Sequence, residues 1–194
     1  MKRQTLVEGV VLTALIVLGV QLRIYFQDLP NFAPVAALAL FAGYYFRSWV
    51  TAVCVPLGVM AISDLFIGGY DWQMMALVYG MLAVPVALRS PLRRYLDVKQ
   101  GGLGRAIGAV SGLVACSLGA SLAFFFVTNF GSWLWFDMYE QTSAGLVTCY
   151  TQALPFFRYT LTGDLCFAVI LFGGYALASQ LGFASRPAAA ADSA

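Results

Sequence analysis

The sequence contains no histidine, and charged residues make up only 10% of its 194 positions. Without histidine, the chain lacks the commonest metal ligand in proteins and the usual general base for catalysis at neutral pH. The four cysteines include no C-x-x-C pair, so neither a zinc site nor a redox motif is indicated. We therefore expect a protein that is not an enzyme and that holds no metal or cofactor.

The net charge is also small, at +2, and the lysines and arginines fall in short loops rather than along one helix face. A nucleic-acid-binding protein needs a basic stripe or patch, so nucleic acid is not an expected partner. Hydrophobic residues, in contrast, make up 61% of the chain, more than in soluble domains. The sequence predicts an all-α integral membrane protein with the lipid bilayer as its main solvent.

Six segments are apolar enough for helices that cross or nearly cross a bilayer core of about 30 Å. They cover residues 6–26, 33–46, 49–67, 73–88, 104–127 and 158–181. The second is short for a full crossing, so we expect it to lie tilted between longer helices or to end below the surface. Residues 1–183 then form a single transmembrane domain, and the Ala-rich residues 184–194 are expected to form a disordered cytoplasmic tail.

The distribution of basic residues orients this bundle of six transmembrane helices. Nine of the 11 lysines and arginines fall on one side if the N-terminus is cytoplasmic, and only Arg23 and Arg158 fall on the other. We therefore predict that both termini are cytoplasmic. The longest outer connection is expected at residues 128–157, and its many aromatic residues indicate either an interfacial belt or a cover over a ligand cavity.

Two aspartates lie inside predicted membrane segments, where ionisable residues are costly and usually functional. Asp164 falls in the first turns of the sixth segment, where the helix dipole favours a carboxylate. Asp64 falls near the end of the third segment, where the dipole opposes it. We therefore expect Asp64 to face the bundle interior or a watery cavity, with Arg23, Arg158, a backbone donor or a ligand as its partner.

The two aspartates also leave open the chemistry of an intramembrane aspartic protease, in which two carboxyl groups share a proton. Such enzymes carry a Gly-x-Gly-Asp motif. Here the corresponding residues are Leu161-Thr162-Gly163-Asp164, so the first glycine is missing.

Amide, carboxylate and aromatic side chains gather on the predicted outer side. This mixture suits an amphiphilic small molecule, because rings supply apolar area and a few polar groups supply orientation. Each group also has a structural explanation, and Asn31 is in a position to cap the second helix. The ligand-binding candidates are Asn31, Phe32, Asp64, Tyr70, Trp72, Asn129, Trp133, Trp135, Tyr139, Arg158 and Asp164.

Small residues recur at every fourth position of the fifth segment, and such a stripe permits close contact between helices. Packing within the bundle and docking onto another membrane subunit both fit it. The helix-packing candidates are Gly104, Gly108, Gly112, Cys116 and Ala120.

The stretch of residues 31–43, followed by Val55-Pro56-Leu57 and by Ser63-Asp64-Leu65, resembles the substrate-binding S components of energy-coupling factor (ECF-type) vitamin transporters. The resemblance implies a six-helix protein of the bacterial cytoplasmic (inner) membrane. It also implies binding and uptake of a vitamin-like solute, with cobalamin as one candidate, from the outer side.

A second resemblance covers residues 128–134, 153–157 and 163–165, which are similar to an uncharacterised family of small bacterial membrane proteins. One pattern of many S components is missing, because Leu18 stands where an Ala-x-x-x-Ala motif starting at Ala14 needs its second alanine. Docking on a shared energising subunit is therefore not implied. The alternative function is an accessory or structural subunit of a larger membrane complex.

Overall fold

The computed structural model describes residues 2–29, 31–96 and 103–181, which form helices and connecting loops without any strand. The prediction of an all-α protein is confirmed. In chain order, the elements are α1 (Lys2–Tyr25), α2 (Val35–Tyr45), α3 (Trp49–Ile67), α4 (Trp72–Ala83), the 3-10 helix η1 (Val84–Leu88), α5 (Arg89–Leu96), α6 (Leu103–Trp135) and α7 (Ser143–Gln180).

Five stretches of helix are long and apolar enough to cross a membrane. Between 17% and 39% of the most apolar window of each stretch is buried, so most of its side chains face the surroundings. A surface of this kind is compatible with a multi-pass membrane protein. The stretches are Thr5–Tyr25, Trp49–Ile67, Trp72–Leu96, Ala106–Trp135 and Ser143–Gln180.

The sequence predicted the first three segments closely, and α3 has the predicted bounds. The fourth segment continues past residue 88 to Leu96. Pro85 does not end it, because this proline occupies the start of η1, where a missing N–H is tolerated. The helical path therefore passes from α4 through η1 into α5.

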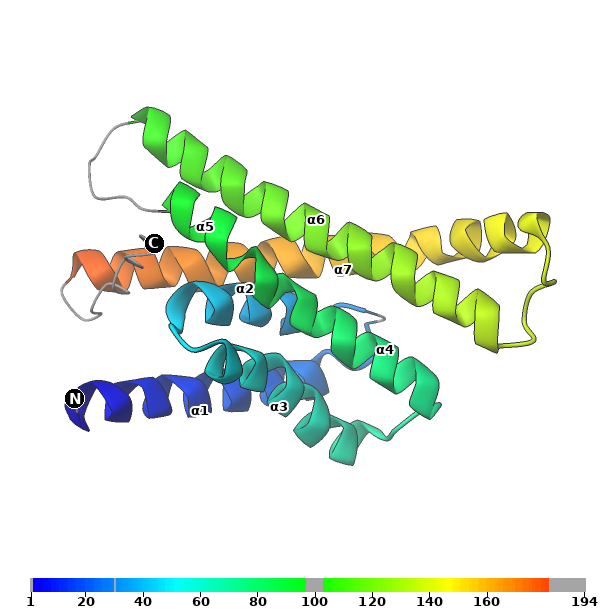
Figure 1. Ribbon diagram of the computed structural model, residues 1–194, viewed down its shortest axis with the longest axis horizontal. Coiled ribbons are helices and arrows are strands. Elements are labelled where there is room, and N and C mark those ends of the chain that lie inside the picture. Colours follow the sequence, from blue (N-terminus) through cyan, green and yellow to red (C-terminus); the bar gives the residue numbers. More distant parts are fainter. Residues whose placement is uncertain (1, 30, 97–102, 182–194) are drawn as a thin grey trace, which may run out of the picture.

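The predicted outer loop at residues 128–157 is wrong. α6 continues to Trp135 and α7 begins at Ser143, so only residues 136–142 connect them. Pro155 lies inside α7, as prolines do in membrane helices whose neighbours compensate for the lost hydrogen bond. At ~1.5 Å per residue, α6 is about 50 Å long and α7 about 57 Å. A prediction that limits each helix to the ~30 Å of a bilayer core therefore ends these two helices too early. α6 and α7 extend past the other helices as a hairpin (Figure 1).

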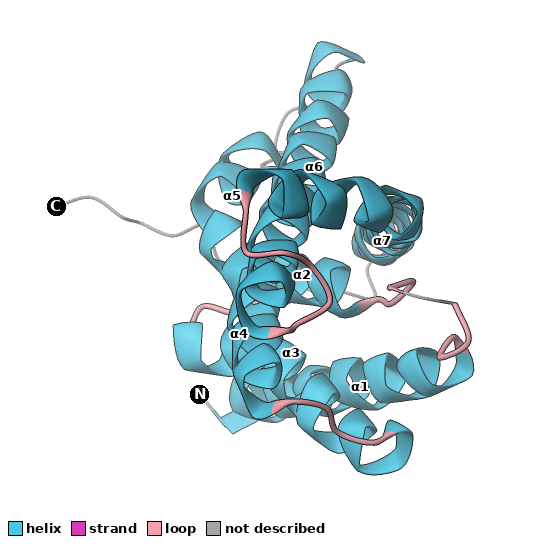
Figure 2. Cartoon of the chain, turned by 90° about the vertical axis from the view of Figure 1, so that its right-hand side faces the viewer, coloured by secondary structure: helices cyan, strands magenta, loops and turns pink. Residues whose placement is uncertain are grey.

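α2 lies at the centre of the fold, with the other helices around it (Figure 2). Nine of its 11 residues are buried. Its length of about 16 Å is short of a full crossing, as expected. A close approach fixes one end, because a Cβ atom at Gly43 would lie 2.8 Å from the carbonyl oxygen of Val86 in η1.

Two arginines of α5 bind the C-terminal end of α2. Arg93 donates hydrogen bonds to the carbonyl oxygens of Gly43 at 3.1 Å, Tyr44 at 3.0 Å and Phe46 at 2.7 Å. Arg89 donates to the carbonyl oxygen of Arg47 at 2.8 Å. The last carbonyls of a helix have no partner within the helix and carry partial negative charge, so guanidinium groups stabilise this end.

The start of α1 and the end of α7 lie at the same end of the molecule, together with the α2–α3 connection and α5 (Figure 1). The α1–α2, α3–α4 and α6–α7 connections lie at the opposite end. The predicted tail at residues 184–194 lies outside the described residues, as do Lys99 and Arg186.

Candidate functional site

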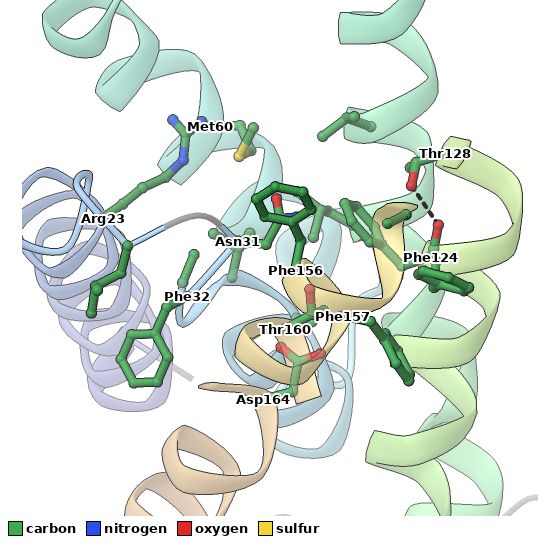
Figure 3. A pocket seen from close by; sticks show the side chains of 18 of the residues that line it. Arg23, Asn31, Phe32, Met60, Phe124, Thr128, Phe156, Phe157, Thr160 and Asp164 are labelled. Carbon is green, nitrogen blue, oxygen red and sulfur yellow. Dashed lines mark hydrogen bonds between the residues drawn. The ribbon is translucent and has the colours of Figure 1, made fainter. Parts of the chain in front are cut away.

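A cavity of about 440 Å³ opens between the ends of α1 and α3, the loop before α2, and the facing sides of α4, α6 and α7 (Figure 3). Most of its wall is apolar. Phenylalanines from the α1–α2 loop, α6 and α7 form much of it, including Phe32, Phe124 and Phe156. The rings of Phe125 and Phe157 join α6 to α7, with their centroids 4.7 Å apart.

The polar groups of the wall come from different helices and connections, and five of them lie in four places. Arg23 ends α1, Tyr70 lies in the α3–α4 connection, Asn129 lies on α6, and Thr160 and Asp164 lie one turn apart on α7. A small number of polar groups in an apolar wall is the usual composition of a pocket for an organic ligand.

Asp64 lies inside the bundle and is 8% exposed. It accepts hydrogen bonds from the guanidinium of Arg23 and, at 2.5 Å, from the hydroxyl of Tyr79. Arg23 also donates to the hydroxyl of Ser63. The prediction that Asp64 faces the interior with a polar partner is confirmed, and Arg23 is that partner. The charge of Arg23 is thereby balanced beside the cavity.

Tyr70 is 41% exposed and borders the cavity from the connection between α3 and α4. Burial of its phenol raises the pKa above the ordinary value, the Asp64 carboxylate raises the pKa further, and Arg23 lowers it. Tyr70 therefore keeps its proton at neutral pH and can donate a hydrogen bond into the cavity.

Asp164 is only 4% exposed, and its carboxyl group points into the cavity (Figure 3). It lies 2.6 Å from the hydroxyl oxygen of Ser121 on α6. No basic side chain that the structure describes forms an ion pair with it. The prediction that it occupies the first turns of a helix is wrong, because α7 begins at Ser143 and Asp164 lies past its middle. The helix dipole therefore does not explain this carboxyl group.

Two amides lie at the cavity in different ways. Asn129 donates from its Nδ2 to the carbonyl oxygen of Phe125 at 2.7 Å. Asn31 has a left-handed backbone with φ of 61°, a conformation that asparagine tolerates better than most residues. It does not cap α2, because the N-cap of α2 is Pro34.

Five of the predicted ligand-binding residues line the cavity, namely Asn31, Phe32, Tyr70, Asn129 and Asp164. Six do not: Asp64, Trp72, Trp133, Trp135, Tyr139 and Arg158. Trp72 begins α4 and is 74% exposed. The exposed Arg158 donates to the hydroxyl of its neighbour Tyr159 at 3.1 Å.

The aromatic residues near the α6–α7 turn hold the turn instead of covering the cavity. The indole of Trp133 donates to the carbonyl oxygen of Glu140 at 2.9 Å. The hydroxyl of Tyr139 donates to the side chain of Gln152 at 3.2 Å. These contacts fix the hairpin tip, and Trp135 is the last residue of α6.

The small-residue stripe of α6 has two parts. Cys116 and Ala120 are buried, and a Cβ atom at Gly112 would lie 2.6 Å from the Cβ of Tyr95 in α5. Nothing lies within 4 Å of a Cβ placed at Gly104 or Gly108. One part of the stripe therefore packs within the molecule, and the other part faces outward.

The sequence prediction missed several lining residues, chiefly Arg23, Phe124, Thr128, Phe157 and Thr160. Their spacing carries a signal. Phe124, Thr128 and Ser132 follow one another at four-residue intervals, as do Phe156, Thr160 and Asp164, so each set shares one helix face. The i, i+4 spacing is informative only within a helix, and the sequence predicts a loop for residues 128–157.

No group of three or more Cys, Asp or Glu side chains in the described ranges is placed to hold a metal ion. No curated protein and no solved structure matches the chain. A family model described as a family of unknown function, DUF6580, matches residues 3–187. The match covers nearly the whole chain, and the protein therefore belongs to this family of unknown function.

Proposed function

We propose that the protein is a multi-pass membrane protein that binds a small, vitamin-class solute in the cavity, for uptake across the bacterial cytoplasmic membrane. The observation that carries this proposal is the 440 Å³ cavity, with polar groups from several helices and loops in a largely apolar wall. Pockets for small organic ligands commonly have volumes of about 300 to 1,000 Å³. This volume favours a small vitamin over cobalamin, whose corrin ring and nucleotide loop are much larger.

The proposed orientation places both termini in the cytoplasm, with six helices in the membrane including the short α2. The ends of the helices support it. The α2–α3 connection carries Arg47, and α5 carries Arg89 and Arg93, at the end of the molecule where α1 begins (Figure 1). Acidic residues Asp28 and Asp71 lie in connections at the opposite end. A cytoplasmic excess of basic residues is the usual arrangement, and the cavity then opens toward the outer side.

An accessory role in a larger membrane complex is the second candidate. Gly104 and Gly108 form a strip on α6 that has no side chain and no described neighbour within 4 Å of a Cβ placed there. Small residues four apart are a common contact surface between membrane helices. In that case the cavity would be a packing space and no solute would bind it.

A thermal-shift screen of the purified full chain against water-soluble vitamins tests the proposal, because a ligand that binds only the folded state raises the melting temperature. Ala153 lines the cavity, so Ala153→Phe places a ring in the space of the solute. Leu154→Phe places the same ring at the neighbouring position, which does not line the cavity and is 54% exposed. We expect a solute that stabilises the wild type and Leu154→Phe but not Ala153→Phe. A screen in which no solute shifts the wild type, or in which Ala153→Phe responds like the wild type, would refute solute binding in this cavity.

A further inference from the structure

We propose that the solute is an organic cation and that it binds at Asp164 in exchange for a proton. This inference rests on the proposed solute-binding function and names the chemical class of the solute. It follows from the charge balance of the cavity, the hydrogen bonding of Ser121 and the aromatic rings of the cavity wall.

The charge balance leaves one carboxyl group without a cation. Arg23 and Asp64 form an ion pair and cancel each other. Asp164 contacts the neutral Ser121 and, within the described part of the chain, no basic side chain. An ionised carboxylate in so apolar a place is costly unless a positive charge is near. The site therefore takes a proton or a cation.

No other titratable group near the site supplies that charge. On the cavity wall the other charged or titratable side chains are Arg23 and Tyr70. The helices packed against α7 are α2 and α6, and their described titratable side chains, Tyr44, Tyr45 and Cys116, do not line the cavity. Asp28, in the loop before α2, also lies outside the wall.

Ser121 can serve both forms of Asp164. Its hydroxyl oxygen lies 3.0 Å from the carbonyl oxygen of Ser117 and 2.6 Å from Asp164, but the hydroxyl has a single hydrogen to donate. In the empty cavity, protonated Asp164 donates to Ser121, and Ser121 donates to Ser117. When the proton leaves, Ser121 turns its hydrogen to the carboxylate. Rotation of one hydroxyl thus accommodates both states without an unsatisfied group.

The rings that line the cavity together with Asp164 favour an organic cation over an inorganic one. Phe32, Phe156 and Phe157 line the same cavity (Figure 3), and aromatic faces attract ammonium and similar cations. A small metal ion would instead need several oxygen ligands close together, and the described residues contain no cluster of three metal-binding side chains. The exchange is balanced: the O–H bond of Asp164 breaks, its proton goes to solvent, and the cation pairs with the carboxylate.

The test uses the purified full chain and three sets of probes at neutral pH. The cations are thiamine, choline and 1-methylnicotinamide, the neutral probes are nicotinamide and riboflavin, and the anions are nicotinate and biotin. 1-Methylnicotinamide, nicotinamide and nicotinate share one pyridine ring and carry charges of opposite sign or none, with small changes of substituent. Calorimetry in two buffers with different heats of ionisation measures the protons released. We expect binding of at least one cation, with measurable release of protons, up to one per bound cation, by linkage.

Asp164→Asn removes the exchangeable charge and keeps the shape of the protonated side chain. It should weaken cation binding by about tenfold or more and abolish proton release, whereas Asp137→Asn, at an exposed position near the hairpin tip, should change neither. The proton measurement on the wild type decides the question even if Asp164→Asn does not fold. Binding of only neutral or anionic probes, or cation binding without proton release, would overturn the inference and leave solute binding intact. If no probe and no vitamin binds, the proposed function fails with it.

Discussion

Arg23, in the last turn of α1, forms an ion pair with Asp64 on α3, across 41 positions of the chain. The side chain of Arg23 is 16% exposed and that of Asp64 is 6% exposed, so neither is well solvated. Tyr79 of α4 donates to the same carboxylate. One charged group therefore fastens three helices at the cavity end of the bundle.

Asp64→Asn and Arg23→Gln should each destabilise the protein by ~3 kcal/mol, because each leaves one buried charge without its partner. The double variant should lose less than the sum of the two, since it leaves no unpaired charge. Thermal unfolding in detergent measures all three. Asp64→Asn should also weaken solute binding, because Asp64 positions Arg23 at the wall. Single variants as stable as the wild type would mean that the pair is not structural.

Arg93→Gln should destabilise the protein by roughly 3 kcal/mol, because Arg93 makes three charge-assisted hydrogen bonds to the end of α2. Arg94→Gln is the matched control. It removes the same charge from the same helix, but the side chain of Arg94 is exposed. Both variants remove one positive charge from α5, but only Arg93→Gln removes the hydrogen bonds to α2. A lower denaturation midpoint in Arg93→Gln than in Arg94→Gln therefore measures the capping. Equal losses in both would contradict the capping role.

Gly112→Ala should destabilise by ~1 to 3 kcal/mol, because its Cβ would lie 2.6 Å from that of Tyr95 and would separate α5 from α6. Gly108→Ala, one turn earlier on α6, has nothing within 4 Å and should be neutral or stabilising by up to ~1 kcal/mol through helix propensity. Melting temperatures of the isolated protein test both. A loss of stability for Gly108→Ala only in cell membranes would indicate a partner on that strip.

Reporter fusions at residue 99 and at the C-terminus should read cytoplasmic, and a fusion near Tyr139 should read extracytoplasmic. The physical reason is the excess of basic residues at the end of the molecule where α1 begins. Paired phosphatase and fluorescent-protein fusions give the sidedness of each position. If residues 99 and 139 reported the same side, the proposed six-helix topology would be wrong.

The sequence alone was sufficient for the helical class and for most of the long apolar helices, because long apolar runs are local properties of the chain. The bounds of α3 and the shortness of α2 followed from such runs. The same reasoning failed for residues 128–157. Their aromatic and polar residues interrupt the hydropathy signal, yet the i, i+4 faces formed by Phe124, Thr128 and Ser132 continue the helix.

What the tertiary structure decided was which distant residues meet. The sequence leaves Arg23, Arg158, a backbone donor or a ligand as the partner of Asp64, and the packing of α1 on α3 selects Arg23. The sequence predicts Asp164 near the start of a helix, but α7 begins at Ser143, so Asp164 lies near the middle of α7, beside Ser121. Hydropathy and periodicity describe neighbours along one helix, whereas a cavity and its charge balance depend on how separate helices pack, so no local pattern specifies them.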